Sequence, residues 1–377
     1  MAKKSYTAED IEVLEGLEPV RQRPGMYIAG TDTPDGLHQL VFEILDNSVD
    51  EAMNGHAKGI VVTLHADAQS VTVSDDGRGI PVENHPKFKK PALELILTTL
   101  HAGGKFSDKN YQTAGGLHGV GSSVVNALSE ELVATVRRGG NEYQQSFSRG
   151  KPTSKMKVVK KGVRGTGTTI FFRPDPDIFS SITFSAERIR SALKTKAYLN
   201  PGLRLRFVNE KKKSDEEFFY PDGISAFLRE SVQEDKLAFI EDEVFFLERE
   251  DGAQVQVALG WTTARAEHWL TYVNGINTPD GGSHETGAKT GIVRAIRNYM
   301  NVHDLQPKNV KISAEDIREG IACVVSVKLP SSTFKMQFQG QTKSKLNNPE
   351  VAPLVENTVK ALEQLLNQKP IAAKAII

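Results

Sequence analysis

The sequence has 377 residues, with 47 Lys plus Arg, 47 Asp plus Glu and a single cysteine, Cys323. Its length predicts two domains or one large domain. Its composition, 39% hydrophobic and 25% charged residues, excludes a largely disordered chain. One cysteine excludes an intrachain disulfide and a cysteine-rich zinc site, and zero net charge argues against tight DNA binding by bulk electrostatics alone.

No run of about 18 apolar residues is present, which excludes a membrane span. No apolar stretch follows the N-terminal lysines, so a secretory signal is not expected. Together with the lone cysteine, these features predict a cytoplasmic protein.

The first clear element is a helix over residues 36–54, whose apolar residues recur at helical spacing and form one face. It follows a turn-rich segment at 23–27. Two β-rich runs come next, at 60–64 and 71–74, and the second leads directly into the loop DDGRGIP. Further helices are predicted at 91–100 and 122–128, and further strands at 132–137, 143–148 and 168–173.

A charge run at 210–217 reads as a solvated hairpin tip or loop, and it lies in the best candidate boundary region, 210–222. Beyond it we predict a smaller mixed α/β domain. Its expected elements are strands at 255–260 and 321–328 and helices at 286–301 and 351–367.

The helix at 36–54 carries Glu43, Asn47, Asp50 and Glu51 on one side, next to its apolar face. A solvated helix flank is the simpler interpretation. However, three carboxylates without a basic partner at i+4 repel one another, and an amide oxygen suits a hard cation. A carboxylate beside such an amide could orient water and hold Mg²⁺ for hydrolysis of a phosphoanhydride.

Two glycine-rich segments extend this hypothesis. Asp75 ends a strand and could accept a hydrogen bond from an exocyclic amine, although Asp-Gly also signals a tight hairpin turn. Residues 103–121 combine dense glycine with a helix start, which can bind phosphate through backbone N–H groups. That segment could equally be a flexible surface loop, and it matches neither a P-loop nor a dinucleotide fingerprint.

The remaining candidates are weaker on sequence alone. Lys343 lies in a glycine-containing loop and reads as a solvated lysine. The histidines show no metal-ligand spacing. Cys323 lies in an apolar run and is predicted to be a core residue.

Five motifs in this order resemble the ATPase region of type IIA topoisomerase B subunits, which include those of bacterial DNA gyrase and topoisomerase IV. The motifs are FEILDNSVDEA (42–52), DDGRGIP (75–81), LHAGGKF (100–106), GGLHGVGSSVVNALS (115–129) and GQTKSKL (340–346). The resemblance covers essentially the whole chain. SDKNYQ (107–112) and SAEDI (313–317) look like topoisomerase IV, whereas GQTKSKL fits either, so the paralogue stays open.

The resemblance implies an α/β (α+β) fold in two domains. Residues 1–221 would form a GHKL-type ATP-binding two-layer sandwich with a mixed sheet and an N-terminal dimerisation arm. Residues 222–377 would form a ribosomal S5 domain 2-like α/β transducer domain. The implied function is an ATP-hydrolysing clamp that couples dimerisation to DNA strand passage; an ATP-gated clamp of the chaperone or mismatch-repair type is the alternative.

The resemblance also implies roles for individual residues. Glu43 corresponds to the general base, with Gln341 and Lys343 reaching the γ-phosphate, and Asn47 corresponds to the Mg²⁺ ligand. The implied ATP-binding residues are Tyr6, Ile11, Tyr27, Asn47, Asp50, Asp75, Arg78, Gly79, Ile80, Pro81, Lys105, Tyr111, Gly116, Leu117, His118, Gly119, Val120, Gly121 and Thr168. Aminocoumarin-type inhibitors would contact Asn47, Asp75, Arg78, Arg138 and Thr168.

The implied partners are a second copy of the chain, the A subunit (gyrase A or ParC), double-stranded DNA and the inhibitors just named, with ATP and Mg²⁺ as cofactors. One departure concerns Gln39, where gyrase relatives often carry histidine. An amide can orient Glu43 but cannot take up a proton as histidine does. The family motif EGDSAGG does not occur in the sequence, so we expect a chain that does not cut DNA by itself.

Overall fold

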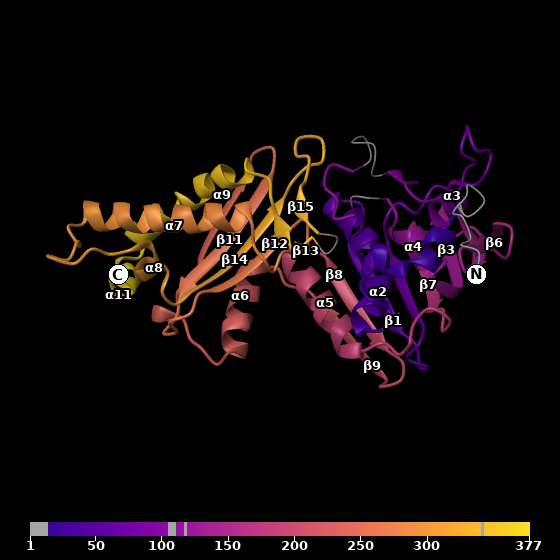
Figure 1. Ribbon diagram of the computed structural model, residues 1–377, viewed down its shortest axis with the longest axis horizontal. Coiled ribbons are helices and arrows are strands. Elements are labelled where there is room, and N and C mark those ends of the chain that lie inside the picture. The colour runs from indigo at the N-terminus through magenta and orange to yellow at the C-terminus, as the bar shows by residue number, and fades with distance from the viewer. Residues whose placement is uncertain (1–13, 105–110, 117–118, 341–342) are drawn as a thin grey trace, which may run out of the picture.

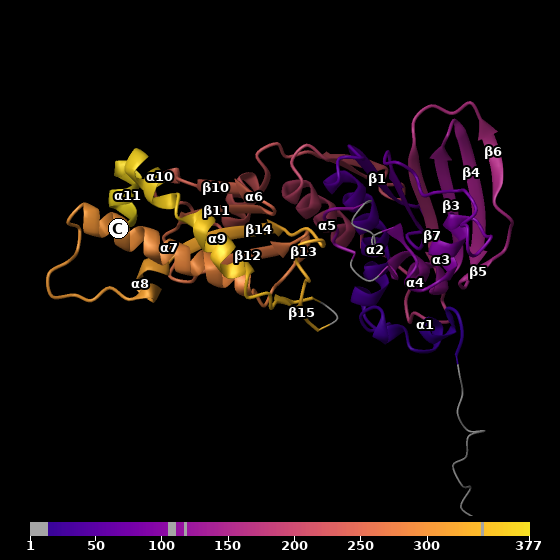
Figure 2. The same cartoon turned by 90° about the horizontal axis from the view of Figure 1, so that it is seen from above.

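The computed structural model describes residues 14–104, 111–116, 119–340 and 343–377. Figures 1 and 2 show two sheets side by side along the longest axis, each covered by helices. The elements of the N-terminal half are α1 (Glu18–Gln22), the 3₁₀ turn η2 (Pro24–Met26), α2 (Pro34–Met53), β1 (Gly59–Leu64), β2 (Val71–Asp75), α3 (Ala92–Thr98), α4 (Gly121–Ala127), β3 (Ser129–Arg138), β4 (Asn141–Ser148), β5 (Lys151–Pro152), β6 (Lys157–Lys161), β7 (Gly167–Pro174), α5 (Ala186–Leu199), β8 (Arg204–Asn209) and β9 (Ser214–Phe218).

The first sheet has the order β5-β4-β3-β7-β2-β1-β8-β9, with β6 paired to β4. It is mixed, because β1 and β8 are parallel while the other neighbours are antiparallel. Buried residues alternate along β1, β2 and β7, as expected for a sheet with one face covered by helices. The predicted two-layer sandwich is therefore confirmed.

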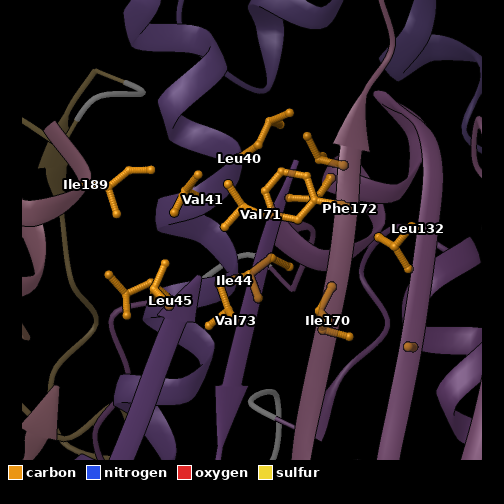
Figure 3. Close-up of a cluster of buried hydrophobic side chains, with 14 of the residues drawn as sticks. Leu40, Val41, Ile44, Leu45, Val71, Val73, Leu132, Ile170, Phe172 and Ile189 are labelled. Carbon is orange, nitrogen blue, oxygen red and sulfur yellow. The ribbon is translucent and has the colours of Figure 1, made fainter. Parts of the chain in front are cut away.

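Helix α2 covers the middle of this sheet, and the sequence predicts it within two residues at each end. Figure 3 shows Leu40, Val41, Ile44 and Leu45 pointing toward Val71, Val73, Ile170 and Phe172 on the strands below. Fully burying one such side chain contributes about 1.5–3 kcal/mol. The apolar face thus fixes the helix on the sheet and leaves its polar side at the rim.

The elements of the C-terminal half are α6 (Gly223–Glu234), the 3₁₀ turn η4 (Ile240–Asp242), β10 (Phe245–Glu250), β11 (Gln254–Trp261), β12 (His268–Val273), β13 (Ile276–Asn277), α7 (Ser283–Val302), α8 (Ala314–Arg318), β14 (Ile321–Lys328), β15 (Phe338–Gln339), β16 (Lys345–Leu346), α9 (Val351–Val359), α10 (Leu362–Gln368) and α11 (Pro370–Ile376). The second sheet has the order β10-β11-β14-β12-β13 and is also mixed, since β12 and β14 are parallel.

Both faces of this second sheet are covered. On β14, Cys323 and Val325 belong to the core shared with α7 and α9, whereas Ala322 and Val324 belong to the core shared with α6. This explains why strand 321–328 is apolar throughout rather than alternating. The prediction that Cys323 is a core residue is confirmed, since the side chain is fully buried.

The charge run at 210–217 forms the tip of the β8–β9 hairpin and part of β9. The first sheet ends at Phe218, and α6 packs on β11 and β14 of the second sheet. We propose the domain boundary after residue 221, between these two elements. Stacked rings of Tyr198, Tyr220 and Phe227 lie where α5 meets α6 and join the two halves.

The single helix predicted over 351–367 is wrong: α9 ends at Val359 and α10 begins at Leu362. At the break the backbone bonds shorten to three residues, from Ala361 N to Thr358 O and from Glu363 N to Lys360 O. Gly291 lets α9 approach α7 closely, because a Cβ there would lie 2.8 Å from that of Val359. The turn after Val359 then allows α10 to bury its own apolar residues in the same core. No glycine or proline marks this break in the sequence.

Within the described ranges, no helix is both long enough and apolar enough to cross a membrane.

Candidate functional site

An open cleft of about 1260 Å³ lies between the polar side of α2, the loop after β2, the glycine-rich segment before α4 and part of α5. The C-terminal half contributes Lys343 and residues of the β12–β13 hairpin to its lining. The cleft is lined by the predicted residues Tyr27, Glu43, Asn47, Asp75, Arg78, Gly79, Ile80, Pro81, Tyr111, Gly116, Gly119, Val120, Gly121, Arg138, Thr168 and Lys343. Asp50 does not line the cleft. The predicted residues Tyr6, Ile11, Lys105, Leu117, His118 and Gln341 lie outside the described residues.

Glu43 lies where α2 meets the start of α4. Gln39, one turn earlier, donates a hydrogen bond from Nε2 to Glu43 Oε1 at 2.8 Å. A Cβ added at Gly121 would overlap the Glu43 carboxylate, so this position requires glycine. Asn47 donates from Nδ2 to Ser122 Oγ at 3.0 Å. The carboxylate and the amide of the predicted pair therefore both face the segment that begins α4.

Asp50 is buried behind the cleft and supports the glycine-rich segment. The backbone N–H groups of Gly115 and Gly116 donate to its two carboxylate oxygens at 2.8 and 3.4 Å. Asp50 therefore supports the wall of the cleft through these two backbone bonds.

Glu51 has no basic partner at i+4, but it is ion-paired with Arg78 from the loop after β2. Arg78 Nη2 donates to Oε1 at 2.7 Å and its Nε to Oε2 at 3.1 Å, while the hydroxyl of Tyr111 donates to Oε1 at 2.5 Å. Burial alone would raise the pKa of Glu51, but these hydrogen bonds lower the pKa to about 2. The i+4 rule missed the partner because Arg78 comes from the loop after β2.

Acid should weaken folding measurably through this pair. The folded pKa of about 2 lies below the ordinary value of 4.5, so the stabilisation is complete above pH 4.5 and is lost as the pH falls toward 2. The shift corresponds to about 3 kcal/mol. Urea unfolding between pH 6 and pH 3 should therefore show a shallower pH dependence for Glu51→Gln than for the wild type. Glu131→Gln, an exposed carboxylate on β3, should keep the wild-type slope; equal slopes in all three proteins would contradict the assignment.

Asp75 ends β2 at the opposite wall of the cleft. It accepts hydrogen bonds from Ser48 Oγ at 2.8 Å, from Gly77 N at 3.0 Å and from Thr168 N at 3.2 Å. Burial raises the pKa of this carboxyl despite those bonds. The residue is thus a fixed, largely desolvated acceptor at the cleft wall.

The loop after Asp75 is not the tight hairpin that Asp-Gly can signal, because β2 pairs with β1 and β7 and the next element is α3. Arg138 on β3 holds this loop in place. Its Nη1 donates to the carbonyl oxygens of Arg78 and Gly79 at 3.2 and 3.0 Å.

Lys343 reaches the cleft from the C-terminal half, as do Tyr272, Ile276 and Asn277 of the β12–β13 hairpin. The Nζ of Lys343 donates to Gly115 O at 3.3 Å, and its φ of 56° is in the left-handed region. The lysine therefore lies against the same glycine that binds Asp50. The sequence around Lys343 favoured a solvated side chain. It could not indicate this contact, because the fold brings together residues 228 positions apart.

Among the residues that the structure describes, no group of three His, Cys, Asp or Glu side chains is placed to hold a metal ion. Glu43 and Asn47 both line the cleft. Mg²⁺ commonly keeps several waters and takes one or two protein oxygens together with substrate phosphates. The residues fit such a shared site and do not form an all-protein cage.

The predicted site residues omit three residues that bond directly to them: Ser48, Glu51 and Ser122. Glu51 was visible as part of the acidic helix side, and Ser48 lies within the same motif. Ser48 bonds to Asp75 at the end of β2, Glu51 to Arg78 in the loop that follows, and Ser122 of α4 to Asn47 on α2. No local spacing identifies these pairs.

The helix that covers this mixed sheet carries an acid and an amide beside a glycine-rich segment. A known class of ATPases has this arrangement. Residues 32–178 match the family model described as histidine kinase-, DNA gyrase B- and HSP90-like ATPase. Residues 223–377 match the model described as DNA gyrase B.

Comparison with curated proteins shows which members of this class of ATPases the chain resembles. The chain is 44% identical to the DNA gyrase B subunit of Campylobacter jejuni over 377 residues, which cover 100% of the chain and 48% of the relative. It is also 44% identical to the DNA topoisomerase 4 B subunit of Bacillus subtilis over 364 residues, which cover 95% and 54%. The chain thus spans about half the length of these relatives.

Solved structures of ATPase domains from the same two kinds of protein superpose on this chain. The 43K ATPase domain of Thermus thermophilus gyrase B, crystallised with an aminocoumarin, superposes with a TM-score of 0.82 at 39% identity, covering 96% of this chain and 92% of that one. The topoisomerase IV ATP-binding domain of Francisella tularensis, in complex with a small-molecule inhibitor, gives 0.81 at 37% identity, covering 97% and 95%. The chain belongs to the family of type IIA topoisomerase B subunits that comprises those of DNA gyrase and topoisomerase IV.

Proposed function

We propose that this chain binds ATP with Mg²⁺ in the cleft and hydrolyses it, as the ATP-driven clamp of a type II topoisomerase B subunit. The observation that carries the proposal is the placement of Glu43 against Gly121 at the start of α4, with Lys343 reaching the same cleft. A carboxylate, a glycine-rich backbone and a cation are what cleavage of a terminal phosphoanhydride requires.

The base of the nucleotide would bind at the Asp75 end. The buried Asp75 carboxylate is an acceptor suited to the exocyclic amine of adenine, and Thr168, Gly79 and Ile80 line the cleft beside it. Arg78 and Pro81 extend that wall, and Tyr27 would lie near the ribose.

The phosphates would bind along the glycine-rich segment, where the backbone N–H groups of Gly116 and of residues 119–121 line the cleft and can contact anionic oxygens. Asp50 supports this segment through Gly115 and Gly116. The predicted contributions of Lys105, Leu117 and His118 rest on the family resemblance alone.

In the reaction, Glu43 would accept a proton from the attacking water, and Gln39 would hold the carboxylate in position through its amide. Asn47 would be the protein ligand of Mg²⁺, which would supply charge neutralisation on the phosphate oxygens. Lys343 would place its ammonium group near the γ-phosphate, and Gln341 beside it is assigned by resemblance.

In the whole protein, ATP binding would close a homodimer through the N-terminal arm that contains Tyr6 and Ile11. The cycle would drive double-stranded DNA passage with the A subunit, gyrase A or ParC, in the cytoplasm. Aminocoumarin-type inhibitors would occupy the base end of the cleft, at Asn47, Asp75, Arg78, Arg138 and Thr168.

The proposal is tested by ATP hydrolysis of the purified chain over a range of protein concentrations, beside Glu43→Ala. We expect specific activity to rise with concentration, because the active form is a dimer, and we expect the variant to be inactive. Absent activity, or full activity in the variant, would mean that the chain binds nucleotide only as a passive module or that Glu43 is not the base.

A further inference from the structure

The turn between β12 and β13 projects from the C-terminal half toward the glycine-rich segment of the cleft. Val273 pairs with Ile276, so Asn274 and Gly275 form a two-residue hairpin loop. Their φ angles of 49° and 74° are both positive, as a type I′ turn requires. Although it belongs to a turn, Asn274 is only 2% exposed.

The Asn274 side chain joins the two halves of the chain. Its Nδ2 donates to Ala114 O at 2.9 Å, in the cleft segment, and to Leu329 O at 3.1 Å, just after β14. Its Oδ1 accepts from Leu329 N at 2.7 Å. The amide is therefore held by its own domain and presents one donor hydrogen to the other.

Gly115, next to Ala114, contacts one residue of α2 and two residues of the C-terminal half. Its N–H donates to Asp50, its carbonyl accepts from Lys343, and a Cβ added to it would lie 2.9 Å from Asn274 O. Only glycine permits this approach of the turn.

Lys196 on α5 fixes the neighbouring residue of the turn. Its Nζ donates to Gly275 O at 2.8 Å and is ion-paired with Asp46 of α2 at 2.6 Å. The turn is thus held between α5 and the cleft segment, next to the helix that carries Glu43.

We infer that Asn274 is a positioning residue that holds segment 114–116 against the C-terminal half, and thereby sets the glycine-rich segment and Lys343 at their working distance. Its effect on turnover rests on the proposed ATPase function; its effect on the segment does not. Lys343 contributes one bond to this segment from a half-buried side chain, whereas Asn274 contributes a buried amide with bonds to both halves.

Two variants separate the backbone from the side chain. Asn274→Gly keeps the positive φ and removes every side-chain bond. Asn274→Asp keeps an acceptor for Leu329 N but removes the donor to Ala114 O, together with the donor to Leu329 O within its own half. Thr271→Val is the matched control, because Thr271 is buried in the same hairpin and its side-chain hydroxyl bonds to Thr278 of that hairpin.

The first measurement is amide hydrogen exchange of residues 111–116 in the chain without nucleotide. Both Asn274 variants should exchange at Gly115 and Gly116 about tenfold faster than the wild type, the effect of losing one buried hydrogen bond. Thr271→Val should leave this exchange unchanged. Wild-type exchange in both Asn274 variants, or an equal increase in the control, would overturn the inference.

The second measurement is steady-state ATP hydrolysis. Both Asn274 variants should lose about tenfold in kcat while KM stays within about twofold, because the bonds lost lie outside the base end of the cleft. Wild-type kcat in these variants would overturn the inference while leaving the proposed function intact. If the wild type itself does not hydrolyse ATP, the proposed function fails and hydrogen exchange alone decides the inference.

Discussion

Glu43→Gln should lower the kcat of ATP hydrolysis by about 10²–10⁴-fold, the contribution of a positioned general base. The amide cannot accept the proton of the attacking water, yet it preserves the shape that packs against Gly121. Nucleotide affinity should remain close to that of the wild type, since the contacts to the base lie at the Asp75 end of the cleft. The measurement is single-turnover hydrolysis together with ADP binding by calorimetry.

The control for this variant is Asp35→Asn, which neutralises an exposed carboxylate at the start of the same helix, where it pairs with Arg188. It should retain the wild-type kcat. If Glu43→Gln hydrolyses ATP at the control rate, the proton is accepted by another group and the catalytic assignment is wrong.

Lys343→Ala should reduce kcat by about 10²-fold, because the variant removes a cation placed where negative charge develops. ADP binding should change little, since ADP lacks the γ-phosphate that this lysine would contact. Lys345→Ala is the matched control: it removes a lysine two positions further, on β16, that does not line the cleft. Comparable ATPase activity of the Lys343 variant and its control would remove Lys343 from the mechanism.

Local periodicity accounts for most of the fold that could be predicted. Helix α2 and strands β1, β2 and β14 carry strong apolar patterns, and their observed bounds lie within about two residues of the prediction. The break between α9 and α10 could not be predicted, because it arises from packing against Gly291 of a distant helix. The pattern of Leu362 and Leu366 continues the apolar face across the break and conceals it.

The site could be predicted where a motif is local and not where it depends on tertiary contacts. Glu43 and Asn47 share one helix side, so spacing alone placed them together, and both line the cleft. The Glu51–Arg78 pair joins a helix to a loop 27 residues away. Lys343 required the resemblance of GQTKSKL, because physical reasoning from its surroundings favoured a solvated side chain.

Apart from that of Lys343, the contacts between the two halves could not be predicted from the sequence. Asn274 and Gly275 signal a hairpin turn by composition. Nothing local indicates that the tip of this turn packs against Gly115 or that Lys196 binds its carbonyl. These contacts depend on how the two sheets are placed relative to one another.

The central claim is that the cleft is the ATP site, and calorimetric titration of a non-hydrolysable ATP analogue with Mg²⁺ into the purified chain tests it most directly. The account predicts one nucleotide per chain and an affinity about 10–100-fold weaker in Asp75→Asn, because a hydrogen bond to a charged group is lost. Asp76→Asn is the matched control: its carboxylate binds the N–H groups of Lys58 and Gly59, away from the cleft. Equal affinity in the Asp75 and Asp76 variants, or no binding by the wild type, would contradict the account.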